Sequence, residues 1–262
     1  MLRVAISTDY PGHPDVLKNV AFDMAPGEIL GLVGQSGSGK STLALAILRL
    51  LQYRGGTVRG RIEFEGRDLA SIPEKLARTY RGRQIAFVPQ SPATSLNPAL
   101  RLRSLISEAW RAHNPRPISQ DAMLHLLQQV SLPAQPDFLA LRSGQLSIGQ
   151  GQRLLIALAL LHHPRLIIAD EPTSALDLIT QQEILRLFRE ISATSGTAIL
   201  FISHDLMSVA QICDRVAILY QGELVEIGAT SQMFERPRHP YSQRLIGAIP
   251  RLEFDRSALT HA

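Results

Sequence analysis

The apolar residues of this chain gather in four short, continuous runs. Runs of this length without alternation are typical of strands that are buried on both faces, as in a parallel sheet covered by helices. We therefore expect an α/β fold built on a parallel sheet. The four runs are EILGLV (28–33), RQIAFV (83–88), RLIIA (165–169) and TAILFIS (197–203).

Each of these runs ends at a polar residue or loop that could take part in chemistry. Ligand sites in parallel α/β sheets lie beyond the carboxyl ends of the strands. The polar ends of the four runs should therefore meet at one edge of the sheet and form a common site. They are Gly34 with the loop after it, Gln90, Asp170 with Glu171, and His204.

The segment between the second and third runs has a helical character. Residues 104–110, 120–132 and 150–161 are predicted to be helices, and proline-bearing loops separate them. Residues 91–160 are therefore expected to form a mostly helical subdomain that is inserted into the α/β core.

Two further features follow the last run. Residues 216–228 contain two strand-like runs joined by Gln221 and Gly222, which predicts a β-hairpin. The tail, residues 235–262, is expected to hold one short helix between Pro240 and Pro250.

The composition indicates a globular protein with a substantial core. With 262 residues, of which 45% are hydrophobic, the chain is long enough for one large domain or two small ones. The net charge of +4 is modest and the charged residues are scattered, which favours a solvated surface over a nucleic-acid-binding stripe. A basic patch that faces a membrane or a partner is still compatible with this distribution.

Cysteine content and hydropathy restrict the compartment. The single cysteine, Cys213, excludes an intramolecular disulfide and a site built from several cysteines, and we expect it to be a packed small hydrophobe. The N-terminus lacks the apolar run of a signal peptide, and no stretch approaches the ~18 apolar residues of a spanning helix. We expect a cytosolic chain that reaches a membrane only through partners.

The strongest chemical motif is GQSGSGKST at residues 34–42, between an apolar strand and the helix-like STLALAILRLL (41–51). It fits the phosphate-binding P-loop pattern, in which glycines let successive backbone N–H groups face a phosphate. Lys40 would reach the β- and γ-phosphates, and the Ser41 hydroxyl would be a Mg²⁺ ligand. The alternative is a glycine-rich turn that only caps the following helix.

LIIADEPTSALD, residues 166–177, would supply the second half of such a site. Asp170 would hold Mg²⁺ through water, and Glu171 is the candidate to polarise an attacking water, a role worth roughly 10²–10⁴ in rate. Alternatively, both carboxylates only favour the N-terminus of a helix that begins near Leu178.

Two more side chains are candidates at the same edge. His204 could donate to a γ-phosphate oxygen or position the water, and the side-chain oxygen of Gln90 could contact Mg²⁺ or the water. By themselves they would be a structural histidine and an ordinary loop glutamine. The other histidines, including His162 and His163, have no metal-ligand neighbours in the sequence and are expected on the surface or in packing.

A second possible anion site lies at GQLSIGQGQR, residues 144–153. A helix is expected to begin here with Ser147 or a neighbour as its cap, and its uniformly apolar sequence predicts burial. Its N-terminus would favour an anion, yet no lysine accompanies it and only Arg153 is close in sequence. The segment therefore resembles half of an anion site.

Together and in this order, these motifs resemble the nucleotide-binding subunit of an ATP-binding-cassette (ABC) transporter over nearly the whole chain. The resemblance implies a P-loop NTPase (RecA-like) core within residues 1–250, with an N-terminal antiparallel β subdomain and the inserted helical subdomain at about 91–160. It identifies GQSGSGKST as Walker A, Gln90 as the Q-loop, LSIGQ as the signature, LIIADE as Walker B, SALD (174–177) as the D-loop and His204 as the switch histidine.

The resemblance also implies roles for single residues. Tyr10 matches the aromatic residue that stacks on adenine, although packing beside Pro11 would explain it as well. The implied catalytic residues are Glu171, His204 and Gln90, and the implied Mg²⁺ ligands are Ser41, Gln90 and Asp170. The implied ATP-binding residues are Tyr10, Gly34, Ser36, Gly37, Ser38, Gly39, Lys40, Ser41 and Thr42.

In this family two such subunits pair head to tail, so the signature helix of one faces the γ-phosphate held by the P-loop of the other. The missing lysine would come from the partner, with Ser147 and Gly149 contacting the phosphate in trans and Gln150 supporting them. ATP binding would close the pair and hydrolysis would release it.

The resemblance implies several partners and a location. They are a second ATPase subunit, identical or homologous, two transmembrane permease subunits and, indirectly, an extracytoplasmic solute-binding protein. No nucleic acid is implied. The chain would lie peripherally on the cytoplasmic face of the inner or plasma membrane.

Two segments narrow the resemblance to importers. SPATSLNP (91–98) and HPYSQRLIGAIP (239–250) are similar to segments of dipeptide, oligopeptide and nickel importer subunits. The tail has no cysteine-rich iron–sulfur motif, so the chain resembles the shorter type, which includes nickel-importer subunits. Peptides and nickel or metal chelates are therefore the candidate cargoes.

Two other classes of function compete with this interpretation. A soluble cassette ATPase that acts on ribosomes or DNA usually has two cassettes or a long coiled-coil insertion, which this chain lacks. A small-molecule phosphotransferase shares the P-loop but does not explain SALD or LSIGQ. One departure from the family pattern is Ile148, where the signature commonly has glycine. We expect it to be tolerated because Ser147 and Gly149 still present their groups; the alternative is that it blocks close approach of the phosphate and weakens one of two composite sites.

Overall fold

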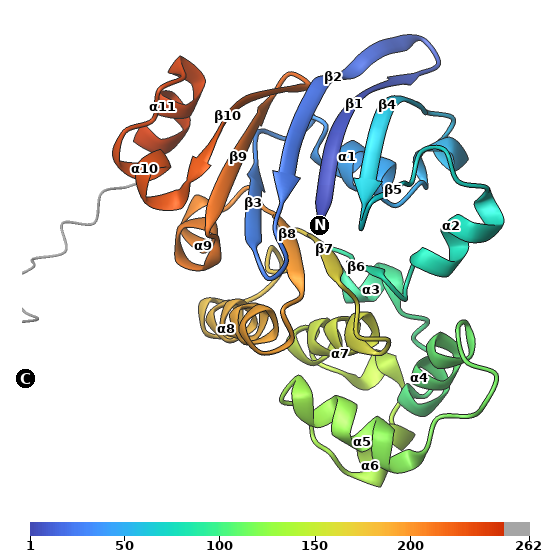
Figure 1. The fold of residues 1–262 in the computed structure, drawn as a ribbon. Helices are drawn as coiled ribbons and strands as arrows, with labels where there is room; N and C mark the ends of the chain where they lie inside the picture. Colours follow the sequence, from blue (N-terminus) through green and yellow to red (C-terminus); the bar gives the residue numbers. More distant parts are fainter. Residues whose placement is uncertain (249–262) are drawn as a thin grey trace, which may run out of the picture.

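A computed structural model of the chain describes residues 1–248 and shows two β-sheets packed in layers with helices (Figure 1). The larger sheet has the strand order β10-β9-β3-β8-β7-β6, in which all strands run parallel except β10, which is antiparallel to β9. The four predicted runs and the predicted hairpin are therefore confirmed as parts of one sheet. Its strands are β3 (Ile29–Val33), β6 (Ile85–Val88), β7 (Leu166–Asp170), β8 (Ala198–Ile202), β9 (Arg215–Tyr220) and β10 (Glu223–Ala229).

The N-terminal residues contribute to a separate antiparallel sheet with the order β2-β1-β4-β5, as the family resemblance implies. Apolar residues alternate with outward-facing ones along its first strand, where Leu2, Val4 and Ile6 are buried. This period of two was readable in the sequence. The strands are β1 (Leu2–Tyr10), β2 (His13–Met24), β4 (Thr57–Phe64) and β5 (Arg67–Asp68).

Helices cover the larger sheet and fill the segment between β6 and β7. In Figure 1, α7 and α8 lie against the sheet, and α4, α5 and α6 are grouped beyond α7. The short 3-10 helices are η1 (Leu51–Arg54) and η2 (Ser143–Gln145). The α-helices are α1 (Lys40–Ile47), α2 (Glu74–Tyr80), α3 (Pro92–Ser95), α4 (Leu102–Arg111), α5 (Gln120–Gln129), α6 (Pro136–Ala140), α7 (Ile148–Leu160), α8 (Leu178–Ser195), α9 (Leu206–Ile212), α10 (Thr230–Glu235) and α11 (Pro240–Gly247).

The larger sheet is buried on both faces, which explains its unbroken apolar runs. On β3, Leu30 and Leu32 belong to the core shared with the N-terminal sheet and α1. Ile29 and Val33 belong to the core on the opposite face, which the helices of the chain's second half complete. A strand between two cores has no position at which a polar side chain reaches water.

Several predicted helices are confirmed, but two end earlier than expected. The helix after the P-loop ends at Ile47, two residues before Arg49, which has a positive φ of 55°. The helix predicted for 120–132 ends at Gln129, close to Ser131, which also has a φ of 55°. A residue in the left-handed region cannot continue a right-handed helix.

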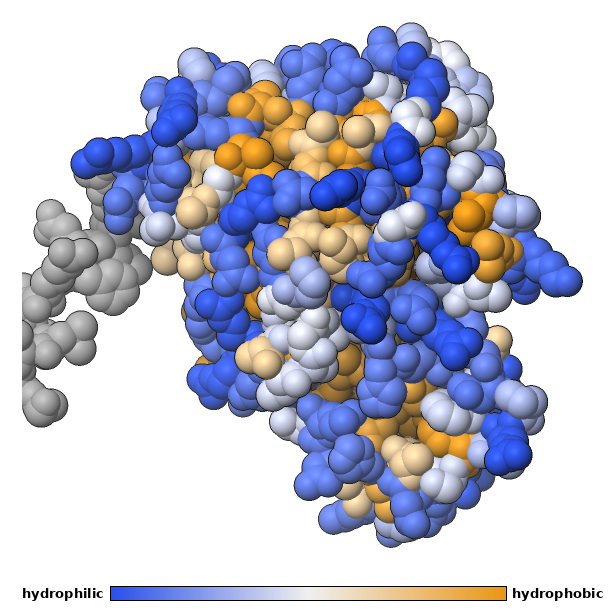
Figure 2. All heavy atoms as spheres, viewed as in Figure 1, coloured by the Kyte–Doolittle hydropathy of each residue, from blue (hydrophilic) through white to orange (hydrophobic). Residues whose placement is uncertain are grey.

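Four further predictions concern membrane-spanning helices, the surface, Cys213 and the tail. Within residues 1–248, no helix combines the length and hydrophobicity needed to cross a membrane. Figure 2 shows a mostly hydrophilic face on which hydrophobic residues gather mainly in the upper part of the view. Cys213 is buried, as predicted, and burial raises the pKa of its thiol. The predicted tail helix is α11; Pro250 lies outside the described residues.

Candidate nucleotide-binding site

Glycines shape the loop between β3 and α1. Gly37 and Gly39 have positive φ angles of 78° and 106°, which favour glycine because it has no Cβ. A Cβ on Gly34 would lie 2.2 Å from the carbonyl oxygen of Leu219, so no side chain fits there. Three glycines of GQSGSGKST are thus required by the loop itself.

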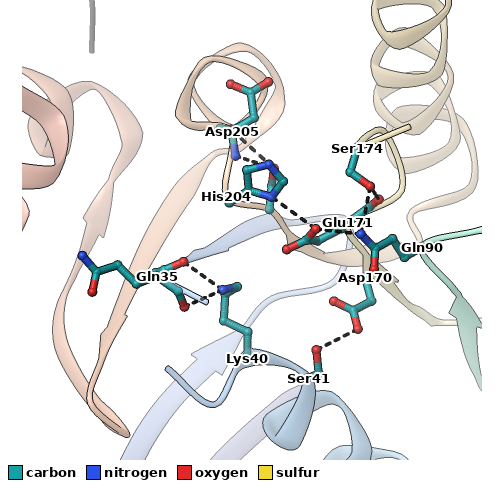
Figure 3. Close-up of polar contacts among 11 residues, drawn as sticks. Gln35, Lys40, Ser41, Gln90, Asp170, Glu171, Ser174, His204 and Asp205 are labelled. Carbon is teal, nitrogen blue, oxygen red and sulfur yellow. Dashed lines mark hydrogen bonds and ion pairs between the residues drawn. The ribbon is translucent and has the colours of Figure 1, made fainter. Parts of the chain in front are cut away.

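Lys40 is the first residue of α1, and its ammonium lies against the loop (Figure 3). Its Nζ donates to the carbonyl oxygens of Gly34 at 2.8 Å and Gln35 at 3.0 Å. Burial lowers the pKa of Lys40, while the carboxylates of Glu171 and Asp170 act in the opposite direction. A buried ammonium that donates to two neutral carbonyls is well placed to receive an anion, because charged acceptors form the stronger hydrogen bonds.

Ser41 and Asp170 bring together one oxygen from α1 and one from the end of β7. The Ser41 hydroxyl donates to Oδ2 of Asp170 at 3.0 Å (Figure 3). Burial raises the pKa of Asp170, and Glu171 raises it further, whereas Ser41 and Lys40 lower it. A hydroxyl and a carboxylate side by side are the hard oxygen ligands that Mg²⁺ takes together with water and phosphate.

Glu171 lies at the centre of the polar contacts at this edge. Its φ of 48° is in the left-handed region, a strained conformation for a residue with a side chain, and its N–H donates to the carbonyl of Ile202 at 2.9 Å. Its Oε2 accepts from Nε2 of Gln90 at 3.0 Å and lies 3.2 Å from Nδ1 of His204 (Figure 3). The polar ends of β6, β7 and β8 therefore meet, as the sequence predicts.

Ser174 is a member of this cluster that the sequence did not reveal. Its hydroxyl accepts from Gln90 Nε2 at 3.1 Å and donates to the carbonyl of Glu171 at 3.1 Å. The amide of Gln90 is thus held between two residues of the segment after β7.

The carboxylates at the end of β7 do not cap the next helix. α8 begins at Leu178, as predicted, but its N-cap is Asp177. Oδ1 of Asp177 accepts from the N–H groups of Ile179 at 3.1 Å and Thr180 at 3.0 Å. The cap of this helix is therefore a different residue from the Asp170–Glu171 pair.

The helix that carries the signature begins with a capping box. Ser147 Oγ accepts from the Gln150 N–H at 3.2 Å, and Gln150 Oε1 accepts from the Ser147 N–H at 3.0 Å. The pattern S-x-x-Q at 147–150 was present in the sequence but not anticipated. Gln150 therefore supports Ser147 within its own chain.

The other residues at this helix start have distinct surroundings. The side chain of Ile148 is 58% exposed. A Cβ on Gly149 would lie 2.7 Å from Cγ2 of Thr180, so this glycine permits close packing against α8. Arg153 is paired with Glu183 at 2.8 Å and is not directed at the helix N-terminus. The cation that follows in this helix is therefore already paired within the chain.

Some candidates lie outside the hydrogen-bonded cluster. Tyr10 ends β1, half-buried, opposite His13 in the β1–β2 hairpin. Ser36 is exposed on the loop, and Ser38 Oγ is buried with no hydrogen-bond partner among the described residues. Thr42 lies in the first turn of α1. Ser147, Gly149 and Gln150 are likewise not part of the contacts among Lys40, Ser41, Gln90, Asp170, Glu171 and His204.

The sequence matches two described protein families. Residues 17–174 match the family described as "ABC transporter". Residues 225–261 match "Oligopeptide/dipeptide transporter, C-terminal region", a match that extends beyond the described residues.

Similar proteins carry related names. The dipeptide transport ATP-binding protein DppD of Bacillus subtilis is 39% identical over 262 residues, which cover 99% of this chain and 78% of that protein. The oligopeptide transport ATP-binding protein OppD of Bacillus subtilis is 40% identical, with 96% and 71% covered. The probable D,D-dipeptide transport ATP-binding protein DdpD of Escherichia coli is 41% identical, with 92% and 74% covered.

Solved structures of similar fold are ATP-binding cassettes. One is a dimeric cassette in a post-hydrolysis state with ADP and Pi, with a TM-score of 0.76, 26% identity, and 88% of this chain and 99% of that one covered. Another is an ATP-binding subunit of an ABC transporter, with a TM-score of 0.72, 28% identity, and 94% and 93% covered. The predicted α/β fold with a P-loop NTPase core is therefore confirmed.

Proposed function

The chain belongs to the ABC transporter family as an ATP-hydrolysing subunit, and we propose that it powers the import of short peptides. The observation that carries this proposal is the meeting of Lys40, Asp170 and Glu171 at one sheet edge, in a chain whose relatives are named for peptide transport. A soluble cassette ATPase acting on ribosomes or DNA is not favoured, because the similar proteins named above are transport subunits.

The phosphate chain of ATP would lie along the loop 34–39 and the start of α1. Backbone N–H groups of the loop and the first turn of α1 would donate to phosphate oxygens, as helix N-termini do in P-loop proteins. Lys40 would exchange part of its contact with the loop carbonyls for contact with the β- and γ-phosphates. The unpaired Ser38 hydroxyl is a further donor in the same loop. Tyr10 would stack on the adenine.

Ser41 and Asp170 fit a Mg²⁺ site, because their oxygens already lie 3.0 Å apart at the end of the loop. When bound with ATP, Mg²⁺ supplies charge neutralisation of the β- and γ-phosphate oxygens. Asp170 would hold the ion through water, and Gln90 would add its side-chain oxygen once its amide leaves Glu171.

Glu171 is the proposed general base. A base must be aimed at the proton that it removes, and contacts from Gln90 and His204 hold the Glu171 carboxylate at the end of β7. The strained backbone of Glu171 is consistent with a catalytic role, since such strain is retained where surrounding structure enforces it. His204 would orient the attacking water or contact the γ-phosphate.

The start of α7 would serve the nucleotide of a second ATPase subunit. Its free N–H groups and the hydroxyl of Ser147 suit an anion, and Arg153, which follows in the same helix, is paired with Glu183 instead. Close approach of Gly149 to α8 fixes where this N-terminus lies. A γ-phosphate held by the partner's P-loop would complete the site, so that ATP closes the pair and hydrolysis reopens it.

The complete importer would contain two membrane-spanning permease subunits and a solute-binding protein on the outer side. This chain would lie on the cytoplasmic face of the membrane and contact the permeases through the region after Gln90. Peptides are the proposed cargo; nickel or a metal chelate is the alternative, because the family includes such importers.

The test is transport by the assembled complex in vesicles. The chain should co-purify with two hydrophobic membrane subunits, and a peptide-loaded receptor should stimulate both ATP hydrolysis and uptake of labelled di- or tripeptides. A complex carrying Glu171→Gln serves as the matched control, with receptor binding retained and uptake lost. Stimulation by nickel chelates and not by peptides would contradict the proposed cargo.

A further inference from the structure

The C-terminal helix contacts the phosphate loop through Tyr241. The Tyr241 hydroxyl accepts a hydrogen bond from the backbone N–H of Gln35 at 3.3 Å, although 206 positions separate them in sequence. Tyr241 is only 4% exposed, and its ring stacks on Tyr220 with 4.0 Å between centroids. Figure 1 shows α11 beside β10, at the edge of the larger sheet. Burial of a tyrosine is favourable when its hydroxyl finds such a partner.

The peptide group that contacts Tyr241 also contacts Lys40. The carbonyl of Gly34 accepts from Lys40 Nζ at 2.8 Å, and the N–H of the same peptide bond belongs to Gln35 and donates to Tyr241. A trans peptide is planar, with its carbonyl and N–H on opposite sides. Holding the N–H therefore fixes the direction of the carbonyl that orients the ammonium.

The same side of the loop rests on the β9–β10 hairpin. The N–H of Gly222 donates to the carbonyl of Ser38 at 3.2 Å. The backbone of Leu219 fills the space that a side chain at position 34 would need. The loop thus has three supports from the last part of the described chain, two from backbone groups and one from the side chain of Tyr241.

The residues before Tyr241 tie the start of α11 to β10. His239 is the N-cap, and its Nδ1 accepts from the Tyr241 N–H at 3.2 Å. Pro240 occupies the first helical position, where its missing N–H leaves no bond unmade. The carboxylate of Glu226 in β10 accepts from the His239 N–H at 2.9 Å. Residues 239–241 (HPY) therefore place the Tyr241 hydroxyl at the backbone N–H of Gln35.

We propose that Tyr241 is a positioning residue for nucleotide binding, which acts by fixing the peptide that directs Lys40 toward the phosphates. This inference rests on the proposed role of Lys40 in binding ATP. Through Tyr241, helix α11 would affect nucleotide affinity by contacting the phosphate-binding loop, without contacting the nucleotide itself.

Two substitutions of equal size test the proposal. Tyr241→Phe removes the hydroxyl and keeps the stacked ring, while Tyr220→Phe removes a hydroxyl from the other ring of the stack. Titration of the full chain with a fluorescent ATP analogue and Mg²⁺ should give a Kd about threefold to tenfold higher for Tyr241→Phe, the loss typical of one hydrogen bond. Tyr220→Phe should bind as the native chain does.

Amide hydrogen exchange at Gln35 gives a second readout that general destabilisation would not reproduce. In Tyr241→Phe this amide should exchange faster than in the native chain, while amides in the middle of β3 keep their rates. Near-UV circular dichroism verifies that both variants are folded.

The possible results separate the two claims. Equal ATP affinity of Tyr241→Phe and the native chain, or equal weakening by both substitutions, would overturn the role of Tyr241. A native chain that binds no ATP would overturn the proposed function instead.

Discussion

Glu171 and His204 face each other at the carboxyl edge of the larger sheet, with Oε2 of Glu171 3.2 Å from Nδ1 of His204. Glu171 follows β7 and His204 follows β8, which are neighbours in the sheet. Gln90, after β6, approaches the same carboxylate oxygen from the other side. Three strand ends therefore determine where one carboxylate points, and this relationship underlies the proposed hydrolysis step.

Glu171→Gln should arrest ATP turnover and preserve ATP binding. The amide keeps the size of the carboxylate and still offers an oxygen to Gln90, but it cannot accept the water's proton. We expect hydrolysis by the assembled complex to fall at least ~100-fold, as loss of a general base requires. Phosphate release and nucleotide titration measure the two effects. Glu190→Gln, an exposed change on α8, is the control. An unaltered rate for Glu171→Gln would exclude Glu171 as the base.

Ile148→Gly should change the ATPase activity of the assembled complex less than ~10-fold, about 1.4 kcal/mol of barrier. The Ile148 side chain is mostly exposed, and the capping box of Ser147 and Gln150 does not depend on it. The helix should lose about 0.5–1 kcal/mol of stability, because glycine gives up more backbone freedom on folding. Steady-state kinetics measure the ATPase activity, and urea unfolding measures the free energy of unfolding. A rise in activity larger than tenfold would show that Ile148 impairs the native site.

Gly149→Ala should destabilise the start of α7, because its Cβ would lie 2.7 Å from Thr180 Cγ2. Overpacking of this kind costs about 1–3 kcal/mol of unfolding free energy, measured in urea. Adding Thr180→Ser removes that methyl group and keeps the hydroxyl bonded to Asp177, so the double variant should recover most of the loss. Gly247→Ala is the matched control, since its Cβ would meet no atom of residues 1–248 within 4 Å. Failure of Thr180→Ser to rescue would refute the close contact as the cause.

His162 should make the stability of the chain depend on pH. Its ring stacks on Trp110 with 5.4 Å between centroids. Nε2 faces the carbonyl of Ala109 at 3.1 Å and must donate there, so Nδ1 accepts from Asn114 Nδ2 at 3.3 Å. Both ring nitrogens are therefore satisfied in the neutral form.

Burial lowers the pKa of His162; the Ala109 carbonyl opposes this, and the nearby charges of His113, Arg83 and His163 lower it further. A histidine whose folded pKa lies below its unfolded value stabilises the fold above the unfolded value, near 6.5, and loses this as pH falls toward the folded pKa. The unfolding free energy should drop on acidification by at most ~1.4 kcal/mol per pH unit from this group. His162→Gln should remove that component, and the exposed His125→Gln should not; equal pH profiles for native chain and His162→Gln would disprove it.

The site could be predicted from the sequence where polar residues follow directly after buried apolar strands. Val33, Val88 and Ile202 end strands that are largely buried on both sides of the sheet. The sequence therefore changes from apolar to polar soon after each of them, and this change could be recognised without a structure. Gly37 and Gly39 have positive φ angles, a local reason for glycine, whereas the need for glycine at Gly34 comes from the carbonyl of Leu219 on a neighbouring strand.

Features that depend on contacts between residues far apart in the chain could not be predicted from the sequence. No local signal places Tyr241 against Gln35, since the contact depends on how α11 docks on the sheet edge. The positive φ of Glu171 likewise arises from its bond to Ile202 in the next strand. The early helix end near Arg49 has local hydrogen bonds, from the Leu50 N–H to the Leu45 carbonyl at 2.8 Å and from the Arg49 N–H to the Ala46 carbonyl at 3.0 Å, but no glycine marks it in the sequence. The Ser147–Gln150 capping box, by contrast, could have been found from its spacing.

The proposed role of the start of α7, to serve the nucleotide of a second subunit, can be tested at Ser147. Aspartate and asparagine both cap helices well, so Ser147→Asp and Ser147→Asn should fold alike and differ by one negative charge. Like charges in contact cost several kcal/mol, so Ser147→Asp should lower hydrolysis by the paired complex at least ~100-fold, with a much smaller effect for Ser147→Asn.

The decisive measurement is the ATP affinity of the unpaired Ser147→Asp chain, obtained by titration alongside Lys40→Ala. We expect native affinity for Ser147→Asp and near-complete loss of binding for Lys40→Ala, because Lys40 acts on its own nucleotide and Ser147 on the partner's. Loss of ATP binding by the unpaired Ser147→Asp chain would place the signature helix at its own nucleotide and contradict the composite site.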